Sequence, residues 1–495
     1  MTTDLSAESA ALSQRHPAGL RTLFFTEMWE RMSYYGMRAL LVFFMTDQIA
    51  GGMGLTERTA NAIYGLYTAA VYLAALPGGW IADRLLGAQR AVWIGGLLIA
   101  AGHFTLGVPS TTTFFLGLML VVLGTGLLKP NISALVGRLY PEGGARRDSG
   151  FTLFYMGINI GALLGPLVCS SLGEKVNWHY GFAAAGVGMV AGLITFHFTH
   201  RNLGDAGLKP EQASPAPARD WSVVGLMMAG LVFVYALAAV GVIAINPVRL
   251  GGTTAWLIAG MAVFYFAWVF FVADLDATEK KRVAVIGVLF VASTMFWAGY
   301  EQVGSSLNLF GRDHTQRFFA WLRWEFPAGW LQSVNPAYVV LFAPMMAALW
   351  LWLARRDIAP SLPVKFAWGL LLLAAGFLVM VGASQRALSA GKVWPTWLIA
   401  TYLLHTIGEL CLSPVGLSSV TKLAPPRFVG QMMGIWFLGT SLGNLLAGLF
   451  AGEVTGDNID SMPSRFLQVV MTTGGAGLLL LVCSKPIRKL MGGVN

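Results

Sequence analysis

Six polar or amphipathic side chains interrupt the first long apolar segment of the chain. They are Glu27, Glu30, Arg31, Tyr34, Tyr35 and Arg38, at relative offsets of 0, 3, 4, 7, 8 and 11 residues. This spacing places them on one face of an α-helix, while Phe, Leu and Met cover the rest of its surface. The charges at the start of the stripe could instead form a solvated patch of ion pairs. Arg38, however, lies about 18 residues into the segment, near the middle of a bilayer, where an unpaired charge costs several kcal/mol. The stripe is therefore predicted to face a water-filled cavity.

Three further ionisable residues lie deep inside apolar segments, namely Lys129, Glu301 and Glu409. Pro130 directly follows Lys129, and Pro414 lies five residues after Glu409, so both helices should kink or open locally. A purely structural kink would explain the prolines alone. A charge beside a helix break inside the membrane favours a binding site, because the freed backbone groups and the charge both need a cavity.

The charges of this set nearly balance. Three cations, Arg31, Arg38 and Lys129, stand against four carboxylates, Glu27, Glu30, Glu301 and Glu409. If all seven face one cavity, one bound proton makes the set neutral. A zwitterionic substrate would bring a carboxylate and an amine without changing that balance. Proton coupling is therefore expected from the charge count, since a buried carboxylate without its own partner favours its protonated form.

The overall composition predicts an all-α membrane protein. Of 495 residues, 56% are hydrophobic and 12% are charged, whereas soluble domains carry about 25% charged residues. Apolar runs long enough to cross a hydrocarbon core about 30 Å thick recur along the whole chain. The net charge of +9 does not indicate nucleic-acid binding, because Lys and Arg do not cluster with aromatic residues on one surface.

The cysteines and the first residues carry no further chemistry. Cys169, Cys411 and Cys483 fall inside apolar segments, which indicates packing thiols rather than disulfides or a metal site. Residues 1–19 are polar and lack the apolar core of a signal peptide, so they are expected to form a cytoplasmic tail.

Length and hydropathy predict about 14 membrane-spanning helices. Their expected positions are 20–49, 60–83, 91–107, 112–138, 149–171, 179–199, 221–244, 253–273, 283–308, 335–354, 365–383, 395–420, 428–451 and 466–484. About 21 of the 33 Lys and Arg residues fall on one face of the membrane and about 9 on the other. The richer face is predicted to be cytoplasmic, and an even number of spans puts both termini there.

The spans fall into groups of six, two and six. A Pro-, Ala- and Ser-rich linker at 201–220 ends the first group. The expected domains are a tail (1–19), a six-helix bundle (20–200), the linker (201–220), an inserted pair with its linker (221–282), a second six-helix bundle (283–486) and a C-terminal tail (487–495). Two groups of six helices are the repeat plan of the major facilitator fold.

Five motifs carry a family resemblance. The stripe E-M-W-E-R-M-S-Y-Y-G resembles the E-x-x-E-R-F-x-Y-Y-G motif of the proton-dependent oligopeptide transporters, the POT family of the major facilitator superfamily. The other four motifs are G-G-W-I-A-D-R-L-L-G (78–87), G-T-G-L-L-K-P-N-I-S (124–133), F-Y-M-G-I-N-I-G-A-L (154–163) and G-E-L-C-L-S-P-V-G-L-S (408–418). The inserted pair is similar to that of bacterial members, so a bacterial inner membrane is expected.

The sequence departs from the family pattern at two places. Met32 stands where the family has Phe, an apolar exchange that leaves the charge unchanged. Gly65 stands where the animal members have a His on the second helix. Proton handling is therefore expected to rest on carboxylates.

The resemblance implies a substrate site of two cations for the peptide carboxylate, a carboxylate and two amides for its amino end, and aromatic or hydroxyl groups for its side chains. In that order these residues are Arg38 and Lys129; Glu409, Asn159 and Asn335; and Tyr34, Tyr35, Tyr72, Trp436 and Ser413. Arg offers a planar fork to a carboxylate, and a carboxylate accepts hydrogen bonds from an ammonium. Aromatic residues in membrane helices more often serve packing, and the stripe adds support to the tyrosine pair alone.

The hypothesis for the proton follows from this charged set. Ionised Glu301 would pair with Arg38 and hold one gate, and protonation together with the peptide carboxylate would release it. The proton-coupling residues are Glu27, Glu30, Arg31 and Glu301, the first three forming a second switch with Lys129. Asp83 and Arg84, at a helix end, are expected to form a gating salt bridge between the bundles.

The predicted function is proton-coupled symport of di- and tripeptides by alternating access, without a cofactor or metal and with a monomer in the bilayer as the working unit. There are three alternatives: a carrier of nitrate, sugar conjugates or drugs; a channel; and an intramembrane enzyme. The charged set argues against the first, and no filter-like loop or H-E-x-x-H pattern supports the other two. The Trp-, Phe- and Arg-rich segment 311–330 is expected to form an amphipathic turn or helix at the interface.

Overall fold

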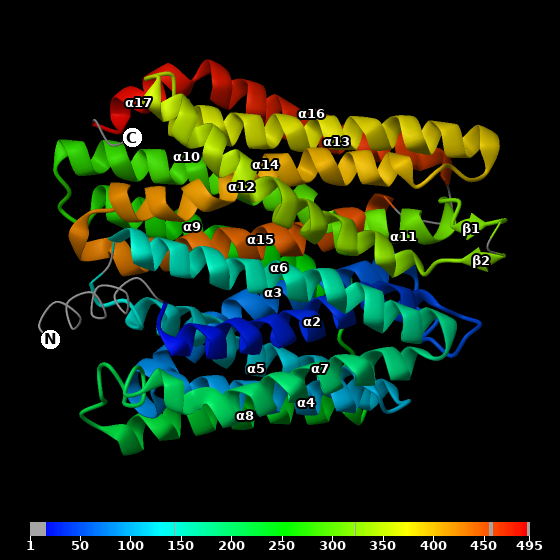
Figure 1. Cartoon of the computed structure of the whole chain (residues 1–495), viewed down its shortest axis with the longest axis horizontal. Coiled ribbons are helices and arrows are strands. Elements are labelled where there is room, and N and C mark those ends of the chain that lie inside the picture. Colours follow the sequence, from blue (N-terminus) through cyan, green and yellow to red (C-terminus); the bar gives the residue numbers. More distant parts are fainter. Residues whose placement is uncertain (1–15, 143, 322, 455–458, 493–495) are drawn as a thin grey trace, which may run out of the picture. The chain divides into compact units, whose positions relative to one another are not determined.

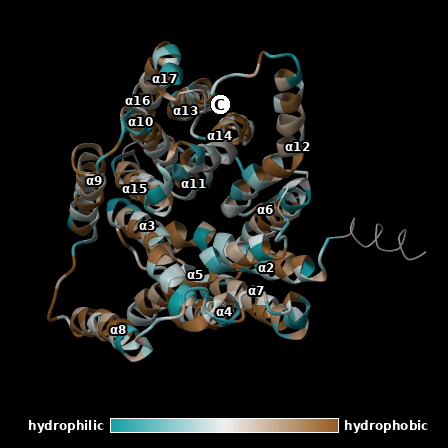
Figure 2. Cartoon of the chain, turned by 90° about the vertical axis from the view of Figure 1, so that its left-hand side faces the viewer, coloured by the Kyte–Doolittle hydropathy of each residue, from teal (hydrophilic) through white to brown (hydrophobic). Residues whose placement is uncertain are grey.

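The structure, a computed structural model, describes residues 16–142, 144–321, 323–454 and 459–492. Figure 1 shows a chain built almost entirely of long helices. Figure 2 shows the hydrophobic colour running over most of them, as expected for helices that face lipid or one another.

Fourteen helices of the described part are at least 19 residues long. They are α2 (Ala18–Thr46), α3 (Glu57–Ile81), α4 (Ala88–Leu106), α5 (Thr111–Arg138), α6 (Gly144–Lys175), α7 (Trp178–Thr199), α8 (Pro217–Ala239), α9 (Pro247–Phe271), α10 (Ala277–Tyr300), α12 (Val334–Arg355), α13 (Leu362–Ala390), α14 (Thr396–Leu423), α15 (Val429–Val454) and α16 (Met462–Val482). Each overlaps one predicted span. By length and hydropathy, 11 helical segments among the described residues could cross a membrane; α2, α4 and α14 fall outside that set, α2 because of its charged stripe.

Shorter elements complete the chain. They are η1 (Ala82–Leu86), η2 (His200–Leu203), η3 (Glu301–Gly304), α11 (Ser306–Asp313), β1 (Phe318–Phe319), β2 (Trp324–Glu325), η4 (Ala328–Ser333), η5 (Pro426–Phe428), η6 (Ile459–Ser461) and α17 (Ser484–Leu490).

The chain divides into two compact units. Unit 1 comprises Met1–Met37, Ala74–Gly165 and Phe182–Ala244, and unit 2 comprises Arg38–Leu73, Pro166–Gly181 and Ile245–Asn495. Helices α2, α3 and α6 therefore each contribute one part to unit 1 and the other to unit 2. The grouping of the spans into six, two and six helices stays a prediction.

Close helix contacts through glycine hold unit 1 together. A Cβ on Gly95 of α4 would lie 2.6 Å from the carbonyl oxygen of Gly124 on α5, so only glycine permits this approach. On α6, a Cβ on Gly161 would lie 2.9 Å from the Cβ of Arg31 on α2. The Gly-rich motif of α6 thus brings its backbone against the charged stripe.

An aromatic and aliphatic core holds unit 2 together. Phe296, Phe366, Phe377 and Phe466, which come from α10, α13 and α16, are fully buried in it. The first half of α3 packs on α15, where the Ser441 hydroxyl donates a hydrogen bond to a carbonyl of α3 at 3.0 Å.

The helix that begins as α10 is broken near Glu301. A capping box between Asp276 and Glu279 starts α10, which ends at Tyr300. A 3-10 turn, η3, follows, and Ser305 (φ −128°, ψ −100°) separates it from α11. The break places Glu301 where the regular hydrogen-bond ladder stops.

The segment 311–330, expected to be an amphipathic turn or helix, is mainly a short hairpin. It comprises the end of α11, the antiparallel pair β1 and β2 with Phe318 opposite Glu325, and the start of η4. An ion pair of 3.0 Å between Arg317 and Glu325 closes the hairpin.

Candidate functional site

The charged residues of the stripe on α2 are all buried. Glu27, Glu30, Arg31 and Arg38 are at most 5% exposed. The division between the units falls directly before Arg38, so Glu27, Glu30 and Arg31 belong to unit 1 and Arg38 belongs to unit 2.

The unit 1 cluster joins two carboxylates to one guanidinium. The Nε atom of Arg31 lies 2.7 Å from Glu27 Oε1 and 2.7 Å from Glu30 Oε2. The guanidinium carbon also lies 5.6 Å from the centre of the Tyr34 ring. Lys129 of α5 is near enough for its charge to act on Glu30. Two carboxylates and two cations thus form a formally neutral set, in which Lys129 is half-buried and the other three are buried.

The unit 2 cluster contains the predicted pair of Arg38 and Glu301. Their side chains form an ion pair and are 6% and 7% exposed. Arg38 Nε also donates a hydrogen bond to the Tyr64 hydroxyl, and the guanidinium lies 5.4 Å from the Tyr64 ring centre. A desolvated pair of this kind is strongly destabilised when one partner is lost, because the other charge is left uncompensated.

Glu409 lies beside this pair. The hydroxyl of Tyr300 donates a hydrogen bond to its carboxylate, and the Asn335 side chain also acts on it. Asn335 Nδ2 donates to the Thr406 hydroxyl at 2.8 Å, one turn before Glu409 on α14. The charge of Glu301 acts on Glu409 as well. Unit 2 therefore brings one cation, two carboxylates and an amide together.

The other predicted substrate residues are distributed over both units. Asn159 is buried in unit 1 and donates a hydrogen bond to the Tyr155 carbonyl oxygen at 2.9 Å. Tyr35 of unit 1 and Tyr72 and Ser413 of unit 2 are half-buried. Trp436 of unit 2 is buried, with its ring centre 6.2 Å from that of Phe366. Their roles in binding stay predictions.

Asp83 and Arg84 have partners inside unit 1. Arg84 lies 3.5 Å from Asp220 at the start of α8, and Asp83 lies 3.8 Å from Arg138. Arg138 also pairs with Glu211 of the linker at 2.7 Å. A gating pair between the bundles stays a prediction.

Sequence reasoning missed two tyrosines of the unit 2 cluster. Tyr64 and Tyr300 each stand next to a residue that was already singled out, Gly65 and Glu301, and that adjacency was the available signal. The structure also explains Gly65. A Cβ there would lie 3.0 Å from the Leu445 carbonyl oxygen and 3.1 Å from Gly448 Cα, so any side chain at this position would press against the backbone of α15.

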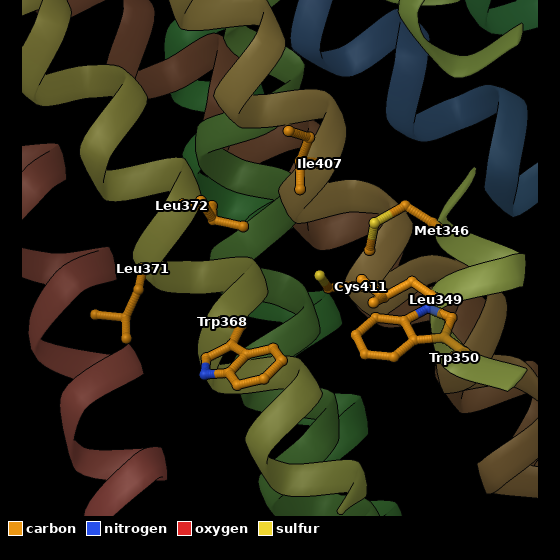
Figure 3. Close-up of a pocket in the computed structure, with 8 residues that line it drawn as sticks. All are labelled: Met346, Leu349, Trp350, Trp368, Leu371, Leu372, Ile407 and Cys411. Carbon is orange, nitrogen blue, oxygen red and sulfur yellow. The ribbon is translucent and has the colours of Figure 1, made fainter. Parts of the chain in front are cut away.

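Unit 2 also contains a cavity that is lined by no charged side chain. It has a volume of about 410 Å³ and lies between α12, α13 and α14. Figure 3 shows its lining, which includes Trp350, Trp368 and Cys411 and no charged side chain. Among the described residues, no group of three or more His, Cys, Asp or Glu side chains could hold a metal ion.

Comparison with known proteins gives one family. The family model described as PTR2, POT family, matches residues 89–461. The peptide transporter YePEPT of Yersinia enterocolitica subsp. palearctica serotype O:3 (strain YE-P4) is 43% identical over 493 residues, covering 96% of this chain and 95% of that protein. A di-/tripeptide transporter of Lactococcus lactis subsp. cremoris is 36% identical over 495 residues, covering 97% of each.

Solved structures give the same result. A peptide transporter POT in complex with sulfate is 40% identical, covers 97% of this chain and 96% of its own, and has a TM-score of 0.89. A POT family transporter in complex with 5-aminolevulinic acid is 34% identical, covers 95% and 97%, and has a TM-score of 0.86. Each match runs over nearly the full length of both chains.

Proposed function

The chain belongs to the POT family of multi-pass membrane transporters, and on this premise we propose that it carries di- and tripeptides into the cytoplasm together with protons. The relatives named as peptide and di-/tripeptide transporters support the substrate class. The Lys and Arg distribution supports a bacterial inner membrane with both termini in the cytoplasm.

The buried pair of Arg38 and Glu301 carries the proposal. A guanidinium and a carboxylate removed from water hold each other strongly only while both are charged. Protonation of Glu301 removes its charge and frees the planar fork of Arg38 for another carboxylate. A peptide C-terminus is such a group. The proton therefore competes with Arg38 for Glu301, and the peptide carboxylate competes with Glu301 for Arg38.

Charge counting supports a proton site in unit 2. Glu301 and Glu409 act on each other, and Arg38 pairs with Glu301. Two carboxylates with one guanidinium carry one excess negative charge, and nearby like charges disfavour double ionisation. One proton neutralises the cluster, and a bound zwitterionic peptide leaves this balance unchanged, because its carboxylate would lie at Arg38 and its ammonium at Glu409 and Asn335.

The remaining roles are those that the family resemblance implies. Arg38 and Lys129 would bind the peptide carboxylate, and Asn159 would join Glu409 and Asn335 at the amino end. Side-chain pockets would be formed by Tyr34, Tyr35, Tyr72, Ser413 and Trp436. The neutral unit 1 cluster, in which Glu27, Glu30 and Arg31 lie together, would be the second proton switch.

Transport would proceed by alternating access. The membrane potential contributes about 2.3 kcal/mol per charge per 100 mV, which is enough to drive accumulation when one proton accompanies a neutral peptide. No cofactor is needed for this scheme, and the monomer contains every group that it uses.

Uptake of dialanine into proteoliposomes of the Glu301→Gln variant tests the proposal. We expect loss of accumulation driven by a proton gradient, with peptide counterflow retained, because the variant still binds peptide but cannot exchange a proton at this position. Glu325→Gln, which breaks the Arg317–Glu325 pair of 3.0 Å in the hairpin, is the matched control and should transport normally. Unimpaired concentrative uptake by Glu301→Gln would refute the proposed role of this pair.

A further inference from the structure

A second cavity of unit 2 is lined by none of the charged residues described above. It has a volume of about 430 Å³ between α10, α15 and α16. Phe450, which lines it, is 47% exposed, and the neighbouring α16 residues Leu467 and Met471 are 42% and 68% exposed. Exposed apolar side chains on a membrane-spanning helix face lipid, so this cavity opens towards the bilayer.

Most polar side chains in the cavity wall already form hydrogen bonds within their own helices. The hydroxyls of Thr294, Thr472 and Thr473 each donate to the carbonyl four residues earlier, at 2.9, 2.9 and 2.7 Å. The Gln302 amide donates in the same way at 3.4 Å and accepts from the Ser306 hydroxyl. The rest of the wall is mainly apolar. A hydrocarbon chain suits this space better than a polar molecule.

The mouth of the cavity is charged. Glu453 lies at the end of α15 and Arg465 in the first turn of α16, with 3.4 Å between Arg465 Nη1 and Glu453 Oε2. Arg465 Nη1 also lies 3.5 Å from Gln468 Oε1. The two charged side chains are 37% and 54% exposed, so a ligand can separate them at little cost. Helix ends lie at the level of the lipid headgroups.

We propose that this cavity binds one phospholipid whose headgroup carries both a phosphate and a primary ammonium, as in phosphatidylethanolamine. The phosphate binds Arg465, the ammonium binds Glu453, and an acyl chain occupies the cavity. A headgroup with a phosphate and no ammonium would leave the negative charges of Glu453 and the phosphate beside each other. A trimethylammonium headgroup has no N–H to donate to that carboxylate.

The site touches the broken helix. Ala298, Gly299 and Gln302 line the cavity, and Gln302 directly follows Glu301 in η3. A lipid seated here packs against the back of the turn that holds Glu301. This inference depends on the membrane location of the chain and not on the proposed substrate or proton coupling.

Native mass spectrometry of the purified full-length protein tests the headgroup. Phosphatidylethanolamine, phosphatidylcholine and phosphatidylglycerol with identical chains would be titrated separately. We expect one phosphatidylethanolamine to bind about tenfold more tightly than the other two, the effect of one charge-assisted contact. Glu453→Gln should remove the preference for phosphatidylethanolamine over phosphatidylcholine, and Arg465→Gln should weaken binding of all three lipids.

The control is Arg146→Gln, which breaks a similarly exposed pair with Glu142 at 3.2 Å outside the cavity and should leave binding unchanged. Val469→Trp fills the cavity but keeps the charged mouth, and it should abolish retention of the lipid while the thermal unfolding temperature shows that the variant folds. Equal binding of the three lipids, a preference for phosphatidylglycerol, or full binding by Val469→Trp would overturn the proposal.

Discussion

Glu174 fastens the end of α6 to the start of η4. Its carboxylate oxygens accept hydrogen bonds from the backbone N–H groups of Ala328 and Gly329, at 2.7 and 2.8 Å. The Trp330 indole donates to the Ser171 hydroxyl at 3.0 Å beside them. The first N–H groups of a helix lack partners within it, and its N-terminal end carries partial positive charge, so a carboxylate stabilises this position.

The Glu174→Gln variant should weaken this contact by a predictable amount. A hydrogen bond to a charged group contributes about 1.5–3 kcal/mol, and Gln keeps one acceptor while it turns an N–H₂ group towards a donor. We expect the free energy that holds this contact between α6 and η4 closed to fall by about 2 kcal/mol. Removing a negative charge from the C-terminal end of α6 returns about 0.5 kcal/mol through the helix dipole. The net loss of about 1.5 kcal/mol corresponds to about tenfold more of the open contact.

Amide hydrogen exchange measures this opening directly. Peptides covering residues 326–333 should exchange about tenfold faster in Glu174→Gln than in the parent protein. Lys175→Gln changes a neighbouring exposed side chain and should leave their exchange unaltered. Unchanged exchange of Ala328 and Gly329 in Glu174→Gln would refute the reasoning, because it would mean that the carboxylate does not hold these amides.

Two further substitutions probe contacts within unit 2. Burial raises the pKa of Asp47, but hydrogen bonds from Trp178 and from loop backbone amides outweigh it and hold that pKa below its ordinary value. Asp47→Asn should therefore lower the free energy of unfolding by about 1 kcal/mol at pH 7 and pH 5 alike. The difference from the parent protein should disappear only below about pH 4, where the parent carboxylate takes up a proton. Thermal unfolding that shows no difference already at pH 5.5 would contradict this. Gly65→Ala should destabilise the protein by about 1–2 kcal/mol through overpacking against Gly448. Gly79→Ala, with nothing within 4 Å of the added methyl, should not lower the unfolding temperature, because alanine favours the helix.

Side-chain chemistry made part of the site predictable. The helical spacing of the stripe and the cost of Arg38 in mid-membrane required a buried partner, and the structure contains the ion pair with Glu301. The long apolar runs likewise marked the helices, because each must satisfy its own backbone groups in lipid. Family membership followed from motifs that lie on several helices.

Contacts made by backbone groups could not be predicted in the same way. The partners of Glu174 are amides of Ala328 and Gly329, which leave no trace in residue type. The hairpin after α11 could not be predicted either, because its two-residue strands are too short to show an alternation of apolar and polar residues. The linker partner of Arg138, Glu211, is one of many charged residues in a polar stretch, and only the fold selects it.

The continuity of α2 limits how its two charge clusters can communicate. Arg31 and Arg38 are seven residues apart on one unbroken helix, a rise of about 10 Å along its axis. At that separation and an effective dielectric constant of about 20, unit charges interact by about 1.7 kcal/mol. Driving a two-state equilibrium from one side to the other needs about 5.5 kcal/mol. Protonation at one cluster therefore cannot switch the other through space alone. In the proposed symport the remaining energy must come from the peptide's own contacts and from movement of α2, which carries both arginines.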